Sequence, residues 1–317
     1  MSLNEAALSI LRTALNSAGE LRIGVSDLHH LTVADFGVAC EGGLAAGLVL
    51  ARICLAGAAE VDVLPAGPQI NVPQVFVRTD YPVRACLQSQ YAGWKIAVSD
   101  YFAMGSGPIR AAASTEALYD EFPVNEVTQA VVGVFEASTF PTAAAADFLR
   151  QALPNAEQIH LCIAPTASQA GNLQVVARSV ETALHKLHEL KFPVQSIVSA
   201  TGTAPLPPVA KNDLAGIGRT NDAILYGAVV NLWVRTEDRV IEQFGPETPS
   251  ESSSSHGQLF IDLFKAANHD FYALDKALFS PAVVVFHNLT SGRSFQFGRT
   301  FPELLAKSFG MSTAGRN

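Results

Sequence analysis

Strand-like and helix-like patterns alternate along this chain, and that alternation limits its fold more than any other feature. An amphipathic helix is predicted at residues 3–18, and runs rich in Val at residues 61–64 and 127–137 predict strands. A further strand at residues 159–164 leads into a loop and then a helix. Alternation of this kind is typical of the α/β class. The 317 residues suffice for one large domain or two of ordinary size.

Residues 164–190 begin as a loop rich in Pro, Thr, Ser and Gly and continue as a predicted long helix. Arg178 and Glu181 lie together on the flank of its apolar stripe, about 60° apart at about 100° per residue, so their head groups can meet. A surface ion pair worth roughly a few tenths of a kcal/mol is one interpretation. The other is a general base at a cleft wall beside a guanidinium that positions water or substrate. The rest of the chain favours the second.

Charge and composition limit the partners. The formal net charge is −8, whereas nucleic acid or an anionic membrane would favour a basic face, so neither is expected. No apolar run approaches the ~20 residues of a membrane span, and the N-terminal helix does not resemble a targeting segment. The four cysteines are dispersed without a CxxC motif, which favours buried free thiols in a reducing compartment. We therefore expect a cytoplasmic protein.

Motifs for metal, nucleotide or covalent chemistry are incomplete. His185 and His188 stand one helical turn apart, but no third metal ligand is suggested. Gly216-Ile-Gly218 approaches a dinucleotide fingerprint, yet Asn221 stands where the third glycine belongs. No G-x-S-x-G elbow occurs. We expect no metal and no cofactor, and instead acid–base chemistry by carboxylate, guanidinium and Lys95.

Several loops are dense in groups that can bind a ligand. Residues 82–96 are predicted to form a helix that ends in a Gly-Trp-Lys bend, and residues 101–110 a glycine-rich loop whose backbone N–H groups are available. Residues 211–222 are predicted to be a polar loop, and residues 246–255, with four consecutive serines, a mobile surface loop. Residues 41–57 combine a glycine-rich turn with small residues, which favours close helix packing over anion binding.

Six strings occur in this order: VRACLQSQYAGWK (83–95), YFAMGSGP (101–108), APTAS (164–168), ARSVET (177–182), GTAPLPPVAK (202–211) and IGRTNDAILYG (217–227). Together they resemble the methenyltetrahydromethanopterin cyclohydrolase family, in its bacterial branch. The resemblance implies two α/β domains enclosing an interdomain substrate pocket, and a homo-oligomer, with a trimer favoured. We place the domain boundary near Pro154, giving residues 1–154 and 155–317, although the chain can cross between domains more than once.

The resemblance also implies a reaction and a set of residues. The family reversibly hydrolyses methenyl-tetrahydromethanopterin to the formyl form, in one-carbon metabolism that includes formaldehyde oxidation by methylotrophic bacteria. The family's catalytic Arg and Glu fall on Arg178 and Glu181: Glu181 would take a proton from the attacking water, which Arg178 orders, and Lys95 is the third catalytic candidate. The pterin-binding candidates are Gln90, Ala92, Gly93, Trp94, Gly105, Ser106, Gly107, Thr166, Ser168, Lys211, Arg219, Thr220, Asn221 and Asp222.

Two other functions stay open at this point. A folate-linked methenyl cyclohydrolase is usually fused to a dehydrogenase with a nucleotide fingerprint, which this chain lacks. A pterin carrier without turnover would gain little from a carboxylate aimed at a hydrolysable bridge. The sequence leaves open the tail of the pterin carrier, the direction of flux and whether Lys95 is catalytic or structural.

Overall fold

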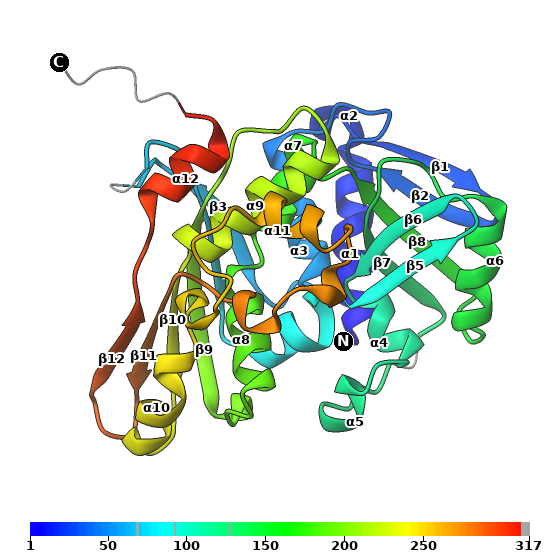
Figure 1. The fold of residues 1–317 in the computed structure, drawn as a ribbon. Coiled ribbons are helices and arrows are strands. Elements are labelled where there is room, and N and C mark those ends of the chain that lie inside the picture. Colours follow the sequence, from blue (N-terminus) through cyan, green and yellow to red (C-terminus); the bar gives the residue numbers. More distant parts are fainter. Residues whose placement is uncertain (68–69, 92, 127, 312–317) are drawn as a thin grey trace. The chain divides into compact units, whose positions relative to one another are not determined.

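The computed structural model describes residues 1–67, 70–91, 93–126 and 128–311. The chain forms two compact units, each made of two segments. The first unit contains Met1–Val61 and Val83–Val175, and the second contains Asp62–Pro82 and Val176–Asn317. The predicted boundary near Pro154 falls inside the first unit. Each unit is centred on its own mixed sheet with helices, so the predicted α/β class is confirmed (Figure 1).

In the first unit, three neighbouring strands, β2, β8 and β7, are parallel, and antiparallel strands extend the sheet on both sides. The strand order is β1 (Gly24–Leu28), β2 (Leu31–Asp35), β8 (Gln158–Ala164), β7 (Ala130–Glu136), β6 (Tyr101–Ser106), β5 (Trp94–Val98). The carboxyl ends of β2, β8 and β7 therefore meet at one edge, where the loops that follow them begin.

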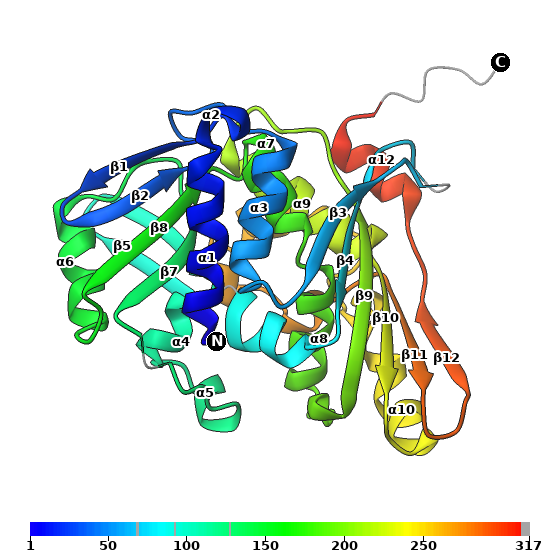
Figure 2. The ribbon, with the colours of Figure 1, turned by 180° about the vertical axis from the view of Figure 1, so that it is seen from behind.

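Helices cover both faces of this sheet. On one face, α1 (Leu3–Asn16) and α3 (Leu44–Cys54) lie side by side (Figure 2) and share a core with Val132 and Val134 of β7. On the other face, α6 (Ala143–Ala152) packs near Phe135. Successive side chains of a strand point to opposite faces, so β7 supplies both cores. The remaining helices are α2 (Ala18–Leu21), the π-helix η1 (Val83–Gln90), α4 (Ile109–Ala113), α5 (Leu118–Glu121) and α7 (Gln169–Val176).

The β5–β6 hairpin corrects one sequence-based expectation. A Gly-Trp-Lys bend at residues 93–95 and a glycine-rich loop at residues 101–110 were expected, but Trp94–Val98 and Tyr101–Ser106 form two paired strands. Trp94 and Ile96 are buried while Lys95 and Ala97 are exposed, which is the alternation of a half-buried strand. Burial of these alternate apolar side chains in the core outweighs the loop tendency of the nearby glycines. The small residues of α3 serve packing, as predicted, because a Cβ on Gly47 would lie 3.0 Å from that of Leu173.

In the second unit, β10 and β11 are parallel and antiparallel strands flank them. The order is β12 (Ser294–Gly298), β11 (Val283–Asn288), β10 (Val229–Val234), β9 (Ile197–Pro205), β4 (Gln74–Thr79), β3 (Glu60–Leu64). The helices are α8 (Ser179–Glu189), α9 (Asp213–Gly227), α10 (Asp238–Phe244), α11 (Phe260–Ala266) and α12 (Pro302–Phe309), with the 3-10 turns η2 (Val194–Ser196), η3 (Gly245–Glu247), η4 (Ser250–Ser252), η5 (Phe271–Ala273) and η6 (Lys276–Leu278).

The serine-rich segment is not the exposed loop that was expected. Thr248 and Ser250 are fully buried, and Ser250 donates a hydrogen bond to the Leu225 carbonyl. The Ser253 hydroxyl donates to the Asp275 carboxylate. The prediction of a mobile surface loop is therefore wrong for these residues, because the hydroxyls find partners far away in the sequence.

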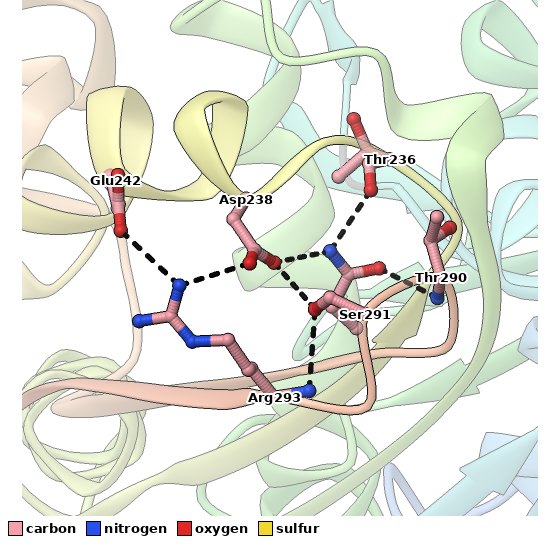
Figure 3. A network of polar contacts seen from close by, with 7 residues as sticks. Thr236, Asp238, Glu242, Thr290, Ser291 and Arg293 are labelled. Carbon is pink, nitrogen blue, oxygen red and sulfur yellow. Dashed lines mark hydrogen bonds and ion pairs between the residues drawn. The ribbon is translucent and has the colours of Figure 1, made fainter.

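Asp238 ties the β11–β12 turn to the start of α10 (Figure 3). Its carboxylate accepts hydrogen bonds from Ser291, from Asn288 and from Arg293. The hydrogen bond from Ser291 has the largest effect, and together the three donors hold the pKa of Asp238 below its ordinary value. This network fixes one end of the second unit's sheet.

Candidate functional site

Arg178 and Glu181 lie at the start of α8, not in the middle of one long helix. The helical pattern over residues 164–190 is interrupted: α7 ends at Val176, and the backbone of Arg178 (φ −91°, ψ 9°) is the N-cap of α8. The predicted single helix is therefore two helices. The spacing of Arg178 and Glu181 by one helical turn is retained, because the Arg178 carbonyl accepts the Thr182 N–H at 2.8 Å and Glu181 stands in the first turn of α8. Arg178 and Glu181 remain neighbours along the helix.

Both charged side chains are withdrawn from water. Arg178 and Glu181 are each only 6% exposed, which is uncommon for charged residues and excludes the interpretation as a solvated surface pair. Glu181 also lies where the positive end of the helix dipole favours an anion. A carboxylate and a guanidinium held here can act on a substrate with little competition from bulk water.

Close packing against the sheet fixes this end of α8. A Cβ on Gly202 of β9 would lie 2.4 Å from the Ser179 hydroxyl and 3.0 Å from Val180, so only glycine allows this approach. Further along α8, the buried Lys186 donates to the Ala277 carbonyl at 2.8 Å and to Ser252 at 3.2 Å. Burial lowers the pKa of Lys186, while the nearby Asp275 and Glu247 oppose that change. The helix carrying Glu181 is therefore anchored along its length.

In the first unit, the structure brings the predicted Gln90 and Ser106 to one buried cysteine, Cys54. The Cys54 Sγ lies 3.3 Å from the Ser106 hydroxyl and 3.9 Å from the Gln90 carbonyl, and Gln174 of α7 donates to it at 3.5 Å. Ser89 in turn donates to the Cys54 carbonyl at 2.7 Å. All five residues are fully buried. Cys54 and Gln174 were not among the sequence-based candidates, because neither stands in a recognisable motif.

The other candidates of residues 92–107 differ in their surroundings. Trp94 is buried in the core, where its ring meets that of Phe135 edge-on at 6.5 Å. Lys95 is exposed on β5, and Gly105 pairs with Trp94 across the hairpin. Gly107 takes a left-handed backbone (φ 84°) that favours glycine, at the turn between β6 and α4. Ala92 lies outside the described residues.

Thr166 and Ser168 belong to the loop between β8 and α7. Thr166 is buried, and the Ser168 hydroxyl donates to the Pro165 carbonyl at 2.8 Å and accepts the Gly171 N–H at 3.0 Å. A Cβ on Gly37 would lie 2.7 Å from Ser168, which places the loop after β2 beside this one. Both loops follow parallel strands, at the edge where α/β sheets bind ligands.

Asp35 orders the loop after β2 and was missed by the sequence analysis. Its carboxylate accepts four consecutive backbone N–H groups at 2.7–2.9 Å, from the residues 37–40. Burial raises the pKa of Asp35, but these donors outweigh it and the pKa lies below its ordinary value. The sequence did contain a signal for such a turn, because Asp35 ends a strand and stands two residues before Gly37.

The candidates of residues 211–222 lie mostly on a helix, and the predicted polar loop is wrong. The Asn212 side chain caps α9 by accepting the Ala215 N–H at 2.9 Å. Lys211 is exposed just before the helix, and Arg219 donates to the Pro208 carbonyl at 3.0 Å. Thr220 and Asn221 donate to carbonyls one turn back in their own helix, at 3.0 Å and 2.8 Å. The glycines that suggested a loop are there for packing: a Cβ on Gly218 would lie 2.9 Å from Ile261.

Asp222 is fully buried and connects α9 to two other helices. One carboxylate oxygen accepts the N–H of Phe260, the first residue of α11, at 2.9 Å. The other accepts the hydroxyl of Ser308, on α12, at 2.6 Å. Burial raises the pKa of Asp222 to about 7, although both hydrogen bonds lower it. The carboxyl group therefore binds a proton more tightly in the folded protein than in the unfolded chain.

Asp222→Asn is expected to make the protein less sensitive to rising pH. Because the folded-state pKa of Asp222 is raised, the stability that this group contributes is fully present below its unfolded pKa of about 4 and is lost as pH rises through about 7. Linkage gives a loss of about 3 kcal/mol between pH 5 and 8. Asparagine can still accept from Phe260 and has no such titration. Denaturant unfolding at both pH values measures the difference.

The exposed Asp147 on α6 supplies the control, because Asp147→Asn is expected to leave the pH dependence of the wild type unchanged. An Asp222→Asn protein with the wild-type loss between pH 5 and 8 would contradict the assignment of this titration to Asp222.

The described part of the chain has neither a cluster of metal ligands nor a helix that could span a membrane. Within residues 1–67, 70–91, 93–126 and 128–311, His, Cys, Asp and Glu side chains form no group of three or more that could hold a metal ion. Over the same residues, the helices are too short or too polar for any to cross a membrane.

Comparisons with known proteins agree on one family. The family model described as Cyclohydrolase (MCH) matches residues 2–309. A protein of Rhodopirellula baltica is 46% identical over 88% of this chain and 86% of its own length. One of Methylobacillus flagellatus is 39% identical (98% and 96%), and one of Methanosarcina barkeri 37% (98% and 99%). Each of these three relatives is named methenyltetrahydromethanopterin cyclohydrolase.

Proposed function

The chain belongs to the methenyltetrahydromethanopterin cyclohydrolase family, as its motifs predicted, and on this basis we propose that it hydrolyses the methenyl bridge of a tetrahydromethanopterin to the formyl form. The observation that carries the proposal is the pair of charged residues at the start of α8. Arg178 and Glu181 keep the spacing of the family's catalytic pair, and both are buried where a base can work away from bulk water.

The substrate needs little activation. Its methenyl carbon belongs to a cationic, amidinium-like group and is already an electrophile, so we propose that no metal and no cofactor takes part. The water oxygen bonds to this carbon, one carbon–nitrogen bond breaks, and the freed nitrogen takes a proton. The products are the formyl compound and one proton released to solvent, which balances the positive charge of the substrate.

We assign roles to the side chains in the same reaction. Glu181 accepts the proton of the attacking water, and Arg178 orders that water and favours the ionised carboxylate. Lys95, which is exposed on β5, is the third proposed catalytic residue. We propose that the pterin contacts the candidates of residues 90–107, 166–168 and 211–222.

The biological setting is also a proposal. The bacterial relatives support a role in one-carbon metabolism, with formaldehyde oxidation in a methylotroph as the expected pathway, in the cytoplasm and as a homotrimer. Size-exclusion chromatography with light scattering tests the trimer. The decay of methenyl absorbance when the protein meets its substrate tests the activity.

A further inference from the structure

Two of the predicted substrate-binding segments meet at a single carbonyl group in the first unit. The Ser89 carbonyl, at the end of η1, accepts the N–H of Gly107 at 3.0 Å. It also accepts a hydrogen bond from the Arg110 guanidinium at 3.1 Å. Gln90 follows Ser89 directly in the chain. Ser89 therefore holds Gln90 and the Gly105–Gly107 segment together. A displacement of this carbonyl would move both segments.

Arg110 is the side chain that holds this junction. It is 1% exposed and ranks first in size among the fully buried side chains of the described residues. Its Nε donates to a Glu116 carboxylate oxygen at 2.8 Å, and Nη2 donates to the other oxygen, so the contact is bidentate. The guanidinium also lies 4.8 Å from the ring centre of Tyr91 and 5.7 Å from that of Tyr119. The guanidinium therefore contacts a carboxylate, a backbone carbonyl and two aromatic rings.

Glu116 connects this cation to Gly93, the residue just before β5. A Cβ on Gly93 would lie 2.6 Å from a Glu116 carboxylate oxygen and 2.7 Å from the Tyr91 ring. The backbone at Gly93 therefore packs directly against Glu116. The helix that carries Arg110, α4, is in contact with η1.

Stability alone is a poor reason for such an arrangement. Burying the Arg110 cation costs solvation energy, and the Glu116 side chain beside it keeps 19% of its surface exposed. Replacing an ion pair that is buried in this way with apolar residues of similar size is often neutral or stabilising. A fork-shaped donor does, however, fix geometry, because it bonds a carboxylate and a carbonyl at defined angles. The pair therefore has the properties expected of side chains that select one backbone conformation at Ser89 and at Gly93.

We propose that Arg110 and Glu116 are positioning residues that hold Gln90, Gly93 and the Gly105–Gly107 segment in the conformation that binds the pterin. This inference rests on the proposed function. The pair acts through the backbone of Ser89 and Gly93, so its loss changes substrate affinity more than protein stability.

The test replaces both members, so that no unpaired charge is left buried. Arg110→Met with Glu116→Leu is expected to raise KM at least about tenfold and to lower kcat by less, because a small misplacement of binding groups weakens binding strongly. The melting temperature is expected to stay within about 5 °C of the wild type. The matched control is Arg22→Met with Glu41→Leu, which removes an exposed pair of the same unit (2.9 Å) and is expected to leave KM unchanged.

The outcomes separate the two proposals. If the wild type turns over the substrate and the folded double variant keeps its KM within twofold, the positioning role is wrong while the proposed function stands. If the wild type shows no turnover, the proposed function itself fails. Should the double variant not fold, Arg110→Lys keeps the charge opposite Glu116 but loses the fork. A wild-type KM in Arg110→Lys would overturn the inference, and a raised KM would support it.

Discussion

Replacing Glu181 by glutamine is expected to lower kcat by roughly 100-fold or more while KM changes little. Glutamine keeps the size and the hydrogen-bonding oxygen of the side chain but cannot accept the proton of the attacking water. The substrate is cationic, so the lost negative charge can weaken binding slightly as well. Glu181 is 6% exposed, and glutamine fills the same buried space without leaving a cavity. A folded protein is therefore expected.

Stopped-flow recording of methenyl absorbance gives kcat and KM for both proteins. Glu189→Gln is the matched control, because it makes the same chemical change at the other end of α8, at a partly exposed residue 3.6 Å from Lys276. Its rate is expected to equal that of the wild type. If Glu181→Gln kept most of its activity, Glu181 would be a structural residue and the base would lie elsewhere.

Removing the Arg178 side chain is the second change with a large expected effect. Arg178→Ala is expected to lower kcat by about 100-fold, the usual cost of losing one fixed electrostatic donor at a reacting centre. Alanine also leaves a space the size of the guanidinium group. Added guanidinium ions are therefore expected to restore part of the rate of Arg178→Ala, as a function of their concentration.

The exposed Arg239 of α10, which pairs with the nearby Glu237, provides the comparison. Arg239→Ala is expected to keep the wild-type rate and to show no response to guanidinium. A fully active Arg178→Ala protein would contradict the role given to Arg178. A raised KM with unchanged kcat would instead make Arg178 a substrate-binding residue.

Local patterns were sufficient to predict the α/β class and the catalytic candidates. Arg178 and Glu181 are three residues apart, so their proximity needs only one helical turn, and it survives although α7 and α8 are separate helices. The strands at residues 61–64 and 159–164 were likewise visible in sequence, because burial of apolar side chains leaves a local periodicity.

Features that depend on distant contacts were not predictable in this way. Gly218 suggested a loop, but it lies inside α9 because Ile261 of α11 packs against it. The serines around Ser250 suggested exposure, but Leu225 and Asp275 supply their partners. The junction at Ser89 joins residues up to 21 positions apart, and no sequence motif indicates it. The sequence suggested the catalytic candidates, which stay a proposal, whereas these long-range contacts became visible only in the fold.

The most direct test of the central claim is the absorbance of methenyl-tetrahydromethanopterin after addition of the purified wild-type protein. We predict a loss of the methenyl absorbance at a rate proportional to the protein concentration, with formyl-tetrahydromethanopterin as the product. Stable absorbance despite binding would identify a carrier, and decay of only the corresponding folate would identify a folate-linked enzyme. Either of these results would contradict the proposed function.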